Sequence, residues 1–306
     1  MKSTSYRKQS KKILFTTFNC AKSQLIPLQA MQEIGNDDLI MALTSLAGGI
    51  LNNGSTCGVV IGGAISSAMI KDKELAGKWM LEDEIQLLRE VKENVTWFEH
   101  SFGTSLCRER EELNYQRITV LGLLNPQKAK GCVARADRSM GYFVEKYNAD
   151  EGVEKKLPKT EKPATKTCEH CAQKILKEIR EETGIGNEEL ERISVALDGG
   201  MGLSGGGCGA LSGALMALGL KYALDPKNTD PDKLKNIYKA MDSAFFNKAK
   251  ILVSKFIKEF ECFECTRLTG ENFENWDAFC EFRRTSSCDK LKQFLVKKTV
   301  EIINLG

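Results

Sequence analysis

Cysteine is the residue type in this chain that points most directly to chemistry, since there are 11 cysteines among 306 residues. Thiolates bind zinc and iron–sulfur clusters, and pairs of thiols exchange disulfides. The number is odd and the cysteines run along the whole chain, unlike the dense spacing of small secreted disulfide scaffolds. We therefore expect metal or redox chemistry rather than a disulfide framework.

The cysteines follow an internal duplication. Without a gap, CAKSQL at 20–25 aligns with CAQKIL at 171–176, and IGNDDL at 34–39 aligns with IGNEEL at 185–190. Such a repeat indicates two copies of one structural unit. Each half then carries four cysteines in the same order, which are Cys20, Cys57, Cys107 and Cys132 in the first and Cys171, Cys208, Cys265 and Cys288 in the second.

The periodicity of the sequence predicts helices. Apolar residues recur at spacings of three and four over 171–184, with Gly184 as a stop, and again over 230–260 and 289–305. Asn187 is expected to cap a further helix over 187–197. Strand candidates are few, namely RISVAL at 192–197 and GCVARA at 131–136. We expect an all-α fold with about five helices in each copy.

The repeats define the expected domains. The first repeat is expected at 13–147 and the second at 167–306, and a charged, proline-containing linker is expected at 148–166. Because the copies are alike, we expect them to pack on each other as the subunits of a homodimer do.

Composition excludes several classes of protein. The net charge is only +3, which gives no reason to expect nucleic acid as a partner. The long uncharged runs contain NNGST in one copy and many glycines in the other, so no membrane span is expected. The first residues lack the features of a secretory signal, and we expect a cytoplasmic protein.

Glycines follow one cysteine of each repeat in the same pattern, CGVVIG after Cys57 and CGALSG after Cys208. A cysteine at the start of a helix faces unpaired N–H groups, which should lower the pKa of its thiol.

The letters at 200–205 also fit the nucleotide-binding pattern GxGxxG. The sequence shows no convincing strand before or after them, as a dinucleotide-binding fold requires. Glycine permits close approach of a cofactor, so the predicted cofactor contacts are Gly58, Gly62, Gly209 and Gly213.

CGALSG, with Cys171 before it and Cys265 and Cys288 after it, resembles the motif of the C_GCAxxG_C_C family of redox-active proteins. The first copy departs from the motif, because Val59 replaces the alanine and NNGST replaces the glycines. The resemblance implies a helical redox domain in each half, in which the four cysteines are the functional set.

The expected function is electron transfer through cysteine-bound iron–sulfur centres, with an unidentified electron-transfer protein as partner. All eight repeated cysteines are the expected ligands. If the chain is an enzyme, it is expected to be an oxidoreductase.

Two alternatives use the extra cysteines of the second copy. Cys168 completes CEHC with Cys171, and Cys262 completes CFEC with Cys265. These CxxC pairs could exchange disulfides, or together hold a structural zinc ion without turnover. His170, inside CEHC, is a candidate substitute ligand. Two residues are expected outside the site, Cys280 as a core thiol and His100 as a surface or packing residue.

Overall fold

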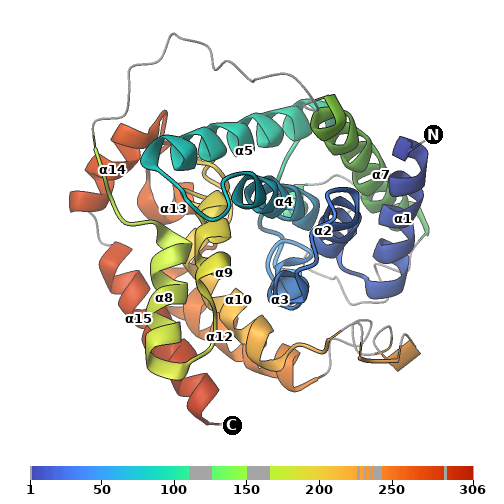
Figure 1. Cartoon of the computed structure of the whole chain (residues 1–306). Helices are drawn as coiled ribbons and strands as arrows, with labels where there is room; N and C mark the ends of the chain where they lie inside the picture. Colours follow the sequence, from blue (N-terminus) through green and yellow to red (C-terminus); the bar gives the residue numbers. More distant parts are fainter. Residues whose placement is uncertain are drawn as a thin grey trace.

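The computed structural model describes residues 2–109, 126–149, 166–225, 243–285 and 288–305, and also 228–230, 232–233 and 236. This part of the chain contains 13 α-helices and no strand, apart from two isolated β-bridges (Figure 1). The prediction of an all-α fold is confirmed. Across the same residues, no helix has the length and apolar character needed to span a membrane.

Equivalent elements follow one another in the two repeats. The first contains α1 (Lys2–Thr17), α2 (Cys20–Met31), α3 (Asp37–Ala42), η1 (Leu43–Leu46), α4 (Gly58–Glu74), α5 (Leu81–Phe102), η2 (Cys107–Glu109) and α7 (Pro126–Ala149). The second contains α8 (Cys171–Thr183), α9 (Glu188–Ile193), η4 (Ser194–Leu197), α10 (Gly209–Tyr222), α12 (Ala244–Phe260), α13 (Cys265–Thr269), α14 (Trp276–Thr285) and α15 (Cys288–Asn304).

The helix boundaries of the second repeat follow the local signals. The side chain of Asn187 accepts a hydrogen bond from the N–H of Leu190 at 2.8 Å, and Gly184 ends α8 with φ 72°. Neither strand candidate forms a strand, since 192–197 spans the end of α9 and η4, and 131–136 lies within α7. The Asn187 cap and the acidic first turn of α9 outweigh the weak strand preference of its β-branched residues.

The predicted linker lies mainly at residues 150–165, outside the described part of the chain. Its expected start at 148 falls inside α7, which continues to Ala149.

The two repeats pack on each other through reciprocal contacts. Helix α10 packs against α3 and η1 of the first repeat, and α4 packs against α9 and η4 of the second. Asn36 Nδ2 donates to Glu189 Oε1 at 2.8 Å, and the equivalent Asn187 Nδ2 donates to Asp38 Oδ2 at 2.8 Å. This exchange of equivalent partners is typical of a twofold interface.

The glycine-rich run of each repeat forms a left-handed turn. Five consecutive residues have positive φ in both copies, 48–52 with values of 50° to 72° and 199–203 with values of 56° to 75°. This conformation costs about 1–2 kcal/mol for each residue that is not glycine. Backbone hydrogen bonds such as Gly205 N to Gly199 O (2.8 Å) close the turn. The glycine-rich run therefore serves to reverse the direction of the backbone before Cys208.

Gly202→Ala should destabilise the protein more than Gly184→Ala. Both glycines have positive φ, but only at Gly202 would a Cβ lie 2.6 Å from a backbone oxygen, that of Leu88 in the first repeat. We expect a loss of about 3 kcal/mol in unfolding free energy for Gly202→Ala and about 1 kcal/mol for Gly184→Ala, measured by denaturant unfolding. Equal losses would contradict the close contact between the repeats.

Candidate functional site

An isolated antiparallel bridge places two cysteines of each repeat. In the second repeat Gly207 pairs with Glu264, and the N–H groups of Cys208 and Cys265 donate across the bridge at 2.8 and 2.6 Å. Each cysteine directly follows a bridged residue, so both side chains lie on one face of the bridge. In the first repeat the bridge between Thr56 and Leu106 holds Cys57 and Cys107 in the same way.

Glycines bring the third cysteine close. A Cβ at Gly213 of α10 would lie 2.9 Å from the carbonyl oxygen of Ala172, in the first turn of α8. A Cβ at the equivalent Gly62 of α4 would lie 2.2 Å from the carbonyl oxygen of Ala21 in α2. Only glycine permits these approaches. In the second repeat this contact places the start of α8, where Cys171 lies, beside the start of α10. In the first repeat it places the start of α2, where Cys20 lies, beside the start of α4.

The other two glycines of the pattern also contact the neighbouring chain. A Cβ at Gly58 would lie 2.4 Å from Cys20 Sγ, and a Cβ at Gly209 would lie 2.6 Å from the oxygen of Leu197. Gly209 also lines the cavity beside the cysteines. The glycines therefore position the site, and a direct contact with a cofactor remains a prediction.

The four repeated cysteines of the second half line one cavity of about 30 Å³. Cys171, Cys265 and Cys288 are the first residues of α8, α13 and α15, and Cys208 is the N-cap of α10. The cavity wall also carries Arg283, Lys292 and aromatic residues, which are Phe273, Phe279 and Phe282. The sequence-predicted ligand set of this repeat is thus brought together in space.

Burial decides the protonation of these thiols. Burial raises the pKa of Cys208 to about 11, although the N–H groups of Leu211 and Ala210 at the start of α10 oppose the shift. Burial likewise raises the pKa of Cys171 and of Cys265. The prediction of a lowered thiol pKa at the helix start is therefore wrong in sign, because desolvation exceeds the effect of the helix N–H groups.

Arg283 brings a cation to the cavity that the sequence did not reveal. The residue is 8% exposed, and its Nε and Nη1 atoms are buried without a hydrogen-bond partner among the described residues. Burial acts to lower the pKa of Arg283, but Cys171 and Cys288 in their thiolate form, the carboxylate of Asp198 and a hydrogen bond with Cys288 raise it above its usual value. A charged guanidinium therefore faces the thiols.

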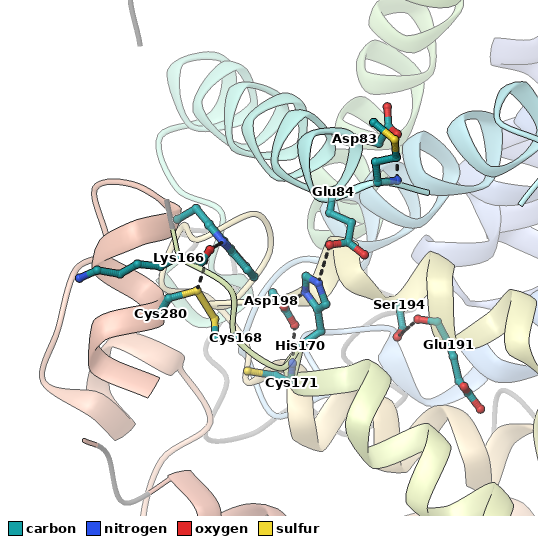
Figure 2. Close-up of polar contacts among 12 residues, drawn as sticks. Asp83, Glu84, Lys166, Cys168, His170, Cys171, Glu191, Ser194, Asp198 and Cys280 are labelled. Carbon is teal, nitrogen blue, oxygen red and sulfur yellow. Dashed lines mark hydrogen bonds and ion pairs between the residues drawn. A yellow bond between two sulfur atoms is a disulfide. The ribbon is translucent and has the colours of Figure 1, made fainter. Parts of the chain in front are cut away.

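His170 is held by two carboxylates, one from each repeat (Figure 2). Its Nδ1 lies 2.5 Å from Asp198 Oδ2, and its Nε2 lies 3.1 Å from Glu84 Oε2 on α5. Asp198 also accepts the N–H of Cys171 at 2.7 Å. Burial acts to lower the pKa of His170, but Asp198 and Glu84 raise it to about 10. Both ring nitrogens have carboxylate partners and His170 does not line the four-cysteine cavity, so the geometry gives no support to its role as a substitute ligand, which stays a prediction.

The extra cysteines of the second repeat do not form CxxC pairs. Cys168 is bonded to Cys280 in a disulfide, with Cα atoms 5.3 Å apart. Cys262 is a free thiol that contacts the carbonyl of Phe260 at 3.5 Å, and it does not line the cavity. The expectation of a free core thiol at Cys280 is wrong, because this buried sulfur is bonded.

His100 lies on the surface of α5, as expected. Its Nδ1 is 2.9 Å from the carbonyl of Thr96.

The first repeat assembles its cysteines less regularly. The N–H of Gly48 points to Cys20 Sγ at 3.5 Å, and a hydrogen bond with Cys57, together with burial, raises the pKa of Cys20 well above its usual value. Cys132 contributes to the same rise, but it lies inside α7 rather than at a helix start. Asn19 occupies the position equivalent to His170.

Residues 18–149 and 169–302 each match a family model described as "Putative redox-active protein (C_GCAxxG_C_C)". The chain belongs to the C_GCAxxG_C_C family. The two matched regions contain all eight repeated cysteines and confirm the tandem duplication. Neither a curated protein nor a solved structure matches the chain.

The thiols of this C_GCAxxG_C_C protein do not converge on one point. Within the described ranges, no group of three or more His, Cys, Asp or Glu side chains is placed to hold a metal ion. The four cysteines of the second repeat surround a cavity instead. The sequence did not predict three charged residues around this site, namely Asp198, Glu84 and Arg283. The one available signal was Asp198, which replaces Ala47 of the first repeat.

The ion pairs of His170 should make stability depend on pH. With a pKa of about 10 in the folded chain and about 6.5 in the unfolded chain, their contribution is complete below pH ~6.5 and lost as the pH rises through 10. His170→Asn should therefore cost on the order of a few kcal/mol at pH 6, and the difference from wild type should shrink by pH 10. Denaturant unfolding at several pH values measures this, and His100→Asn is the control. A pH-independent difference would contradict the charged state of His170.

Proposed function

We propose that the second repeat binds an iron–sulfur cluster through four thiolates and exchanges electrons with a partner protein. The proposed ligands are Cys171, Cys208, Cys265 and Cys288. The observation that carries the proposal is the buried guanidinium of Arg283, which lines the same cavity as these thiols and whose Nε and Nη1 atoms have no hydrogen-bond partner among the described residues. A bound cluster would supply the electron-accepting centre of a redox protein.

Charge balance supports this proposal. A buried cation without an anionic partner costs several kcal/mol. The Nε and Nη1 atoms of Arg283 have no hydrogen-bond partner among the described residues, and Asp198, a carboxylate that raises the pKa of Arg283, is also paired with His170. Metal binding displaces the thiol protons and converts the cysteines to thiolates. Four thiolates around an iron–sulfur core would provide the negative charge that the guanidinium requires.

The N–H groups at the start of α10 support the same function. Those of Ala210 and Leu211 are directed at Cys208 Sγ. Hydrogen bonds to cysteine sulfur stabilise iron–sulfur clusters and adjust their reduction potential. The motif glycine Gly209 leaves this part of the cavity wall open beside the sulfur.

A single zinc ion is less well supported. Tetrahedral zinc needs four sulfurs at about 2.3 Å from one point. No such grouping occurs among the described residues. A cluster distributes its ligands over several iron atoms, which agrees better with thiols spread around a cavity.

Thiol–disulfide catalysis by the four cysteines is also less well supported. The thiolate is the attacking species in such exchange. Burial raises the pKa of Cys171, Cys208 and Cys265. These thiols are therefore protonated and weakly nucleophilic at neutral pH without a metal.

For the first repeat we propose a second ligand set, formed by Cys20, Cys57, Cys107 and Cys132. The shared bridge and the proximity of Cys20 to Cys57 support it. The histidine–aspartate pair of the second repeat has no equivalent in the first, where Asn19 and Ala47 take these positions. We expect any centre here to differ from the other in stability and potential.

Cys208→Ala should remove the centre of the second repeat, whereas Cys280→Ala should leave it in place. Both cysteines are buried, but only Cys208 belongs to the proposed ligand set. Protein purified without oxygen is assayed for iron, acid-labile sulfide and visible absorption per chain. Loss of about half or more of the iron in Cys208→Ala alone is expected. Equal iron in both variants, or no iron and sulfide in the wild type, would refute the proposal.

Arg283→Met should lower the reduction potential of the second centre. Removal of a nearby positive charge makes addition of an electron less favourable. Arg284→Met is the matched control, because Arg284 is the exposed neighbour on the same helix. Potentiometric titration of the visible or EPR signal measures the shift. Equal shifts in the two variants would exclude a direct effect of Arg283 on the centre.

A further inference from the structure

The disulfide between Cys168 and Cys280 ties one wall of the cavity to the segment before α8. Cys280 lies on α14, the helix that also carries Phe279, Phe282 and Arg283 into the cavity wall. Figure 2 shows the bond beside Lys166 and close to the start of α8. The position of this wall is therefore fixed by a covalent bond that a reductant can break.

The repeat does not require this bond to assemble its four cysteines. The first repeat has Thr17 at the position equivalent to Cys168, and it has no cysteine between Cys107 and Cys132. It nevertheless forms the same bridge and places Cys20 beside Cys57. The disulfide is thus an addition to the second repeat, next to its cavity.

Besides the disulfide, the buried side chains of Trp276 and Phe279 hold α14, and the ring of Trp276 lies 5.1 Å from that of His170. No extensive packing of α14 against another helix occurs within the described residues. Its start is tied to Lys166, whose carbonyl accepts the indole N–H of Trp276 at 2.8 Å and whose ammonium pairs with Glu281. With little close packing against other helices, α14 depends on its own side chains and on the disulfide for its position.

The cavity is small for the proposed ligand. Its volume of about 30 Å³ accommodates one or two water molecules. An iron–sulfur core is larger, so the wall must move for it to enter. The wall formed by α14 is the part that the disulfide holds in place.

We propose that the Cys168–Cys280 disulfide is an exchange site for a dithiol, and that its reduction frees α14 and opens the four-cysteine cavity. What enters the opened cavity depends on the proposed function, whereas the exchange and the opening do not. Cys280 is fully buried and Cys168 is half-buried, so an incoming thiolate reaches the sulfur of Cys168.

The dithiol alone supplies the two electrons and the two protons that reduction of the disulfide requires. Its first thiolate attacks Cys168 Sγ, the Cys168–Cys280 bond breaks, and Cys280 leaves as a thiolate that takes a proton. The carbonyl oxygen of Lys166, 4.0 Å from Cys280 Sγ, is placed to accept the new S–H. The second thiolate of the reagent then attacks the reagent's own sulfur in the mixed disulfide, and Cys168 leaves and is protonated. Two electrons pass to the protein and the reagent becomes a disulfide.

The test uses iron-free full-length chain, oxidised or treated with dithiothreitol that is then removed without oxygen. Each cysteine is followed by alkylation and peptide mass spectrometry. Reduction should speed alkylation of Cys208 and Cys265 at least tenfold, because both are buried in the oxidised form. Cys57 and Cys107 are also buried in the first repeat and serve as internal controls whose rates should stay unchanged. The Cys168→Ser/Cys280→Ser double variant should match the reduced chain.

Three outcomes would overturn the proposal. The disulfide could resist excess dithiothreitol until the chain unfolds, as judged by circular dichroism. All four buried thiols could gain reactivity together, which would make the bond a general support of the fold. Reduction could also leave Cys208 and Cys265 unchanged. None of these outcomes bears on iron content, so the proposed cluster stands or fails separately.

Discussion

The contact that the rest of the structure depends on is the close approach of two helices in each repeat, α10 on α8 and α4 on α2. At Gly213 and Gly62 the space for a Cβ is already occupied by the backbone of the neighbouring helix. A larger residue would push α10 away from α8 and separate Cys208 from Cys171. The left-handed turn before α10 and the bridge to Cys265 then fix the remaining geometry. The glycines of the family motif therefore act on cysteine chemistry through helix distance.

Desolvation governs the behaviour of the assembled thiols. The helix N–H groups act to lower the pKa of Cys208, but the opposite effect of burial is larger and raises the pKa to about 11. An exposed cysteine at the same helix start would behave in the opposite way, as a reactive thiolate. Burial raises the pKa of Cys171, Cys208 and Cys265 and thereby disfavours exchange chemistry there, whereas the exchange that we propose takes place at the Cys168–Cys280 bond beside the cavity. In these proposals, metal binding and disulfide exchange take place at separate but neighbouring cysteines of the second repeat.

The sequence was sufficient for the duplication, the helical class and the grouping of the second set of cysteines, because these depend on spacing. Asn187 and Gly184 marked helix ends through local hydrogen bonding and backbone conformation, which short segments specify. The Cys168–Cys280 bond and the place of Arg283 were not predictable, since they depend on how α14 meets a segment more than 100 residues away. The sign of the Cys208 pKa shift also required the burial that only the assembled fold provides.

The two repeats differ in the charged residues around their cysteines. Asp198 binds both the N–H of Cys171 and the ring of His170, and His170 in turn holds Glu84 of the first repeat. Ala47 and Asn19 at the equivalent positions make none of these ion pairs, and Asn19 caps α2 instead. The first repeat therefore contributes Glu84 to the neighbourhood of the other half's cysteines. A duplicated chain, unlike a homodimer, can change one copy independently, and here one copy supports a site that the other carries.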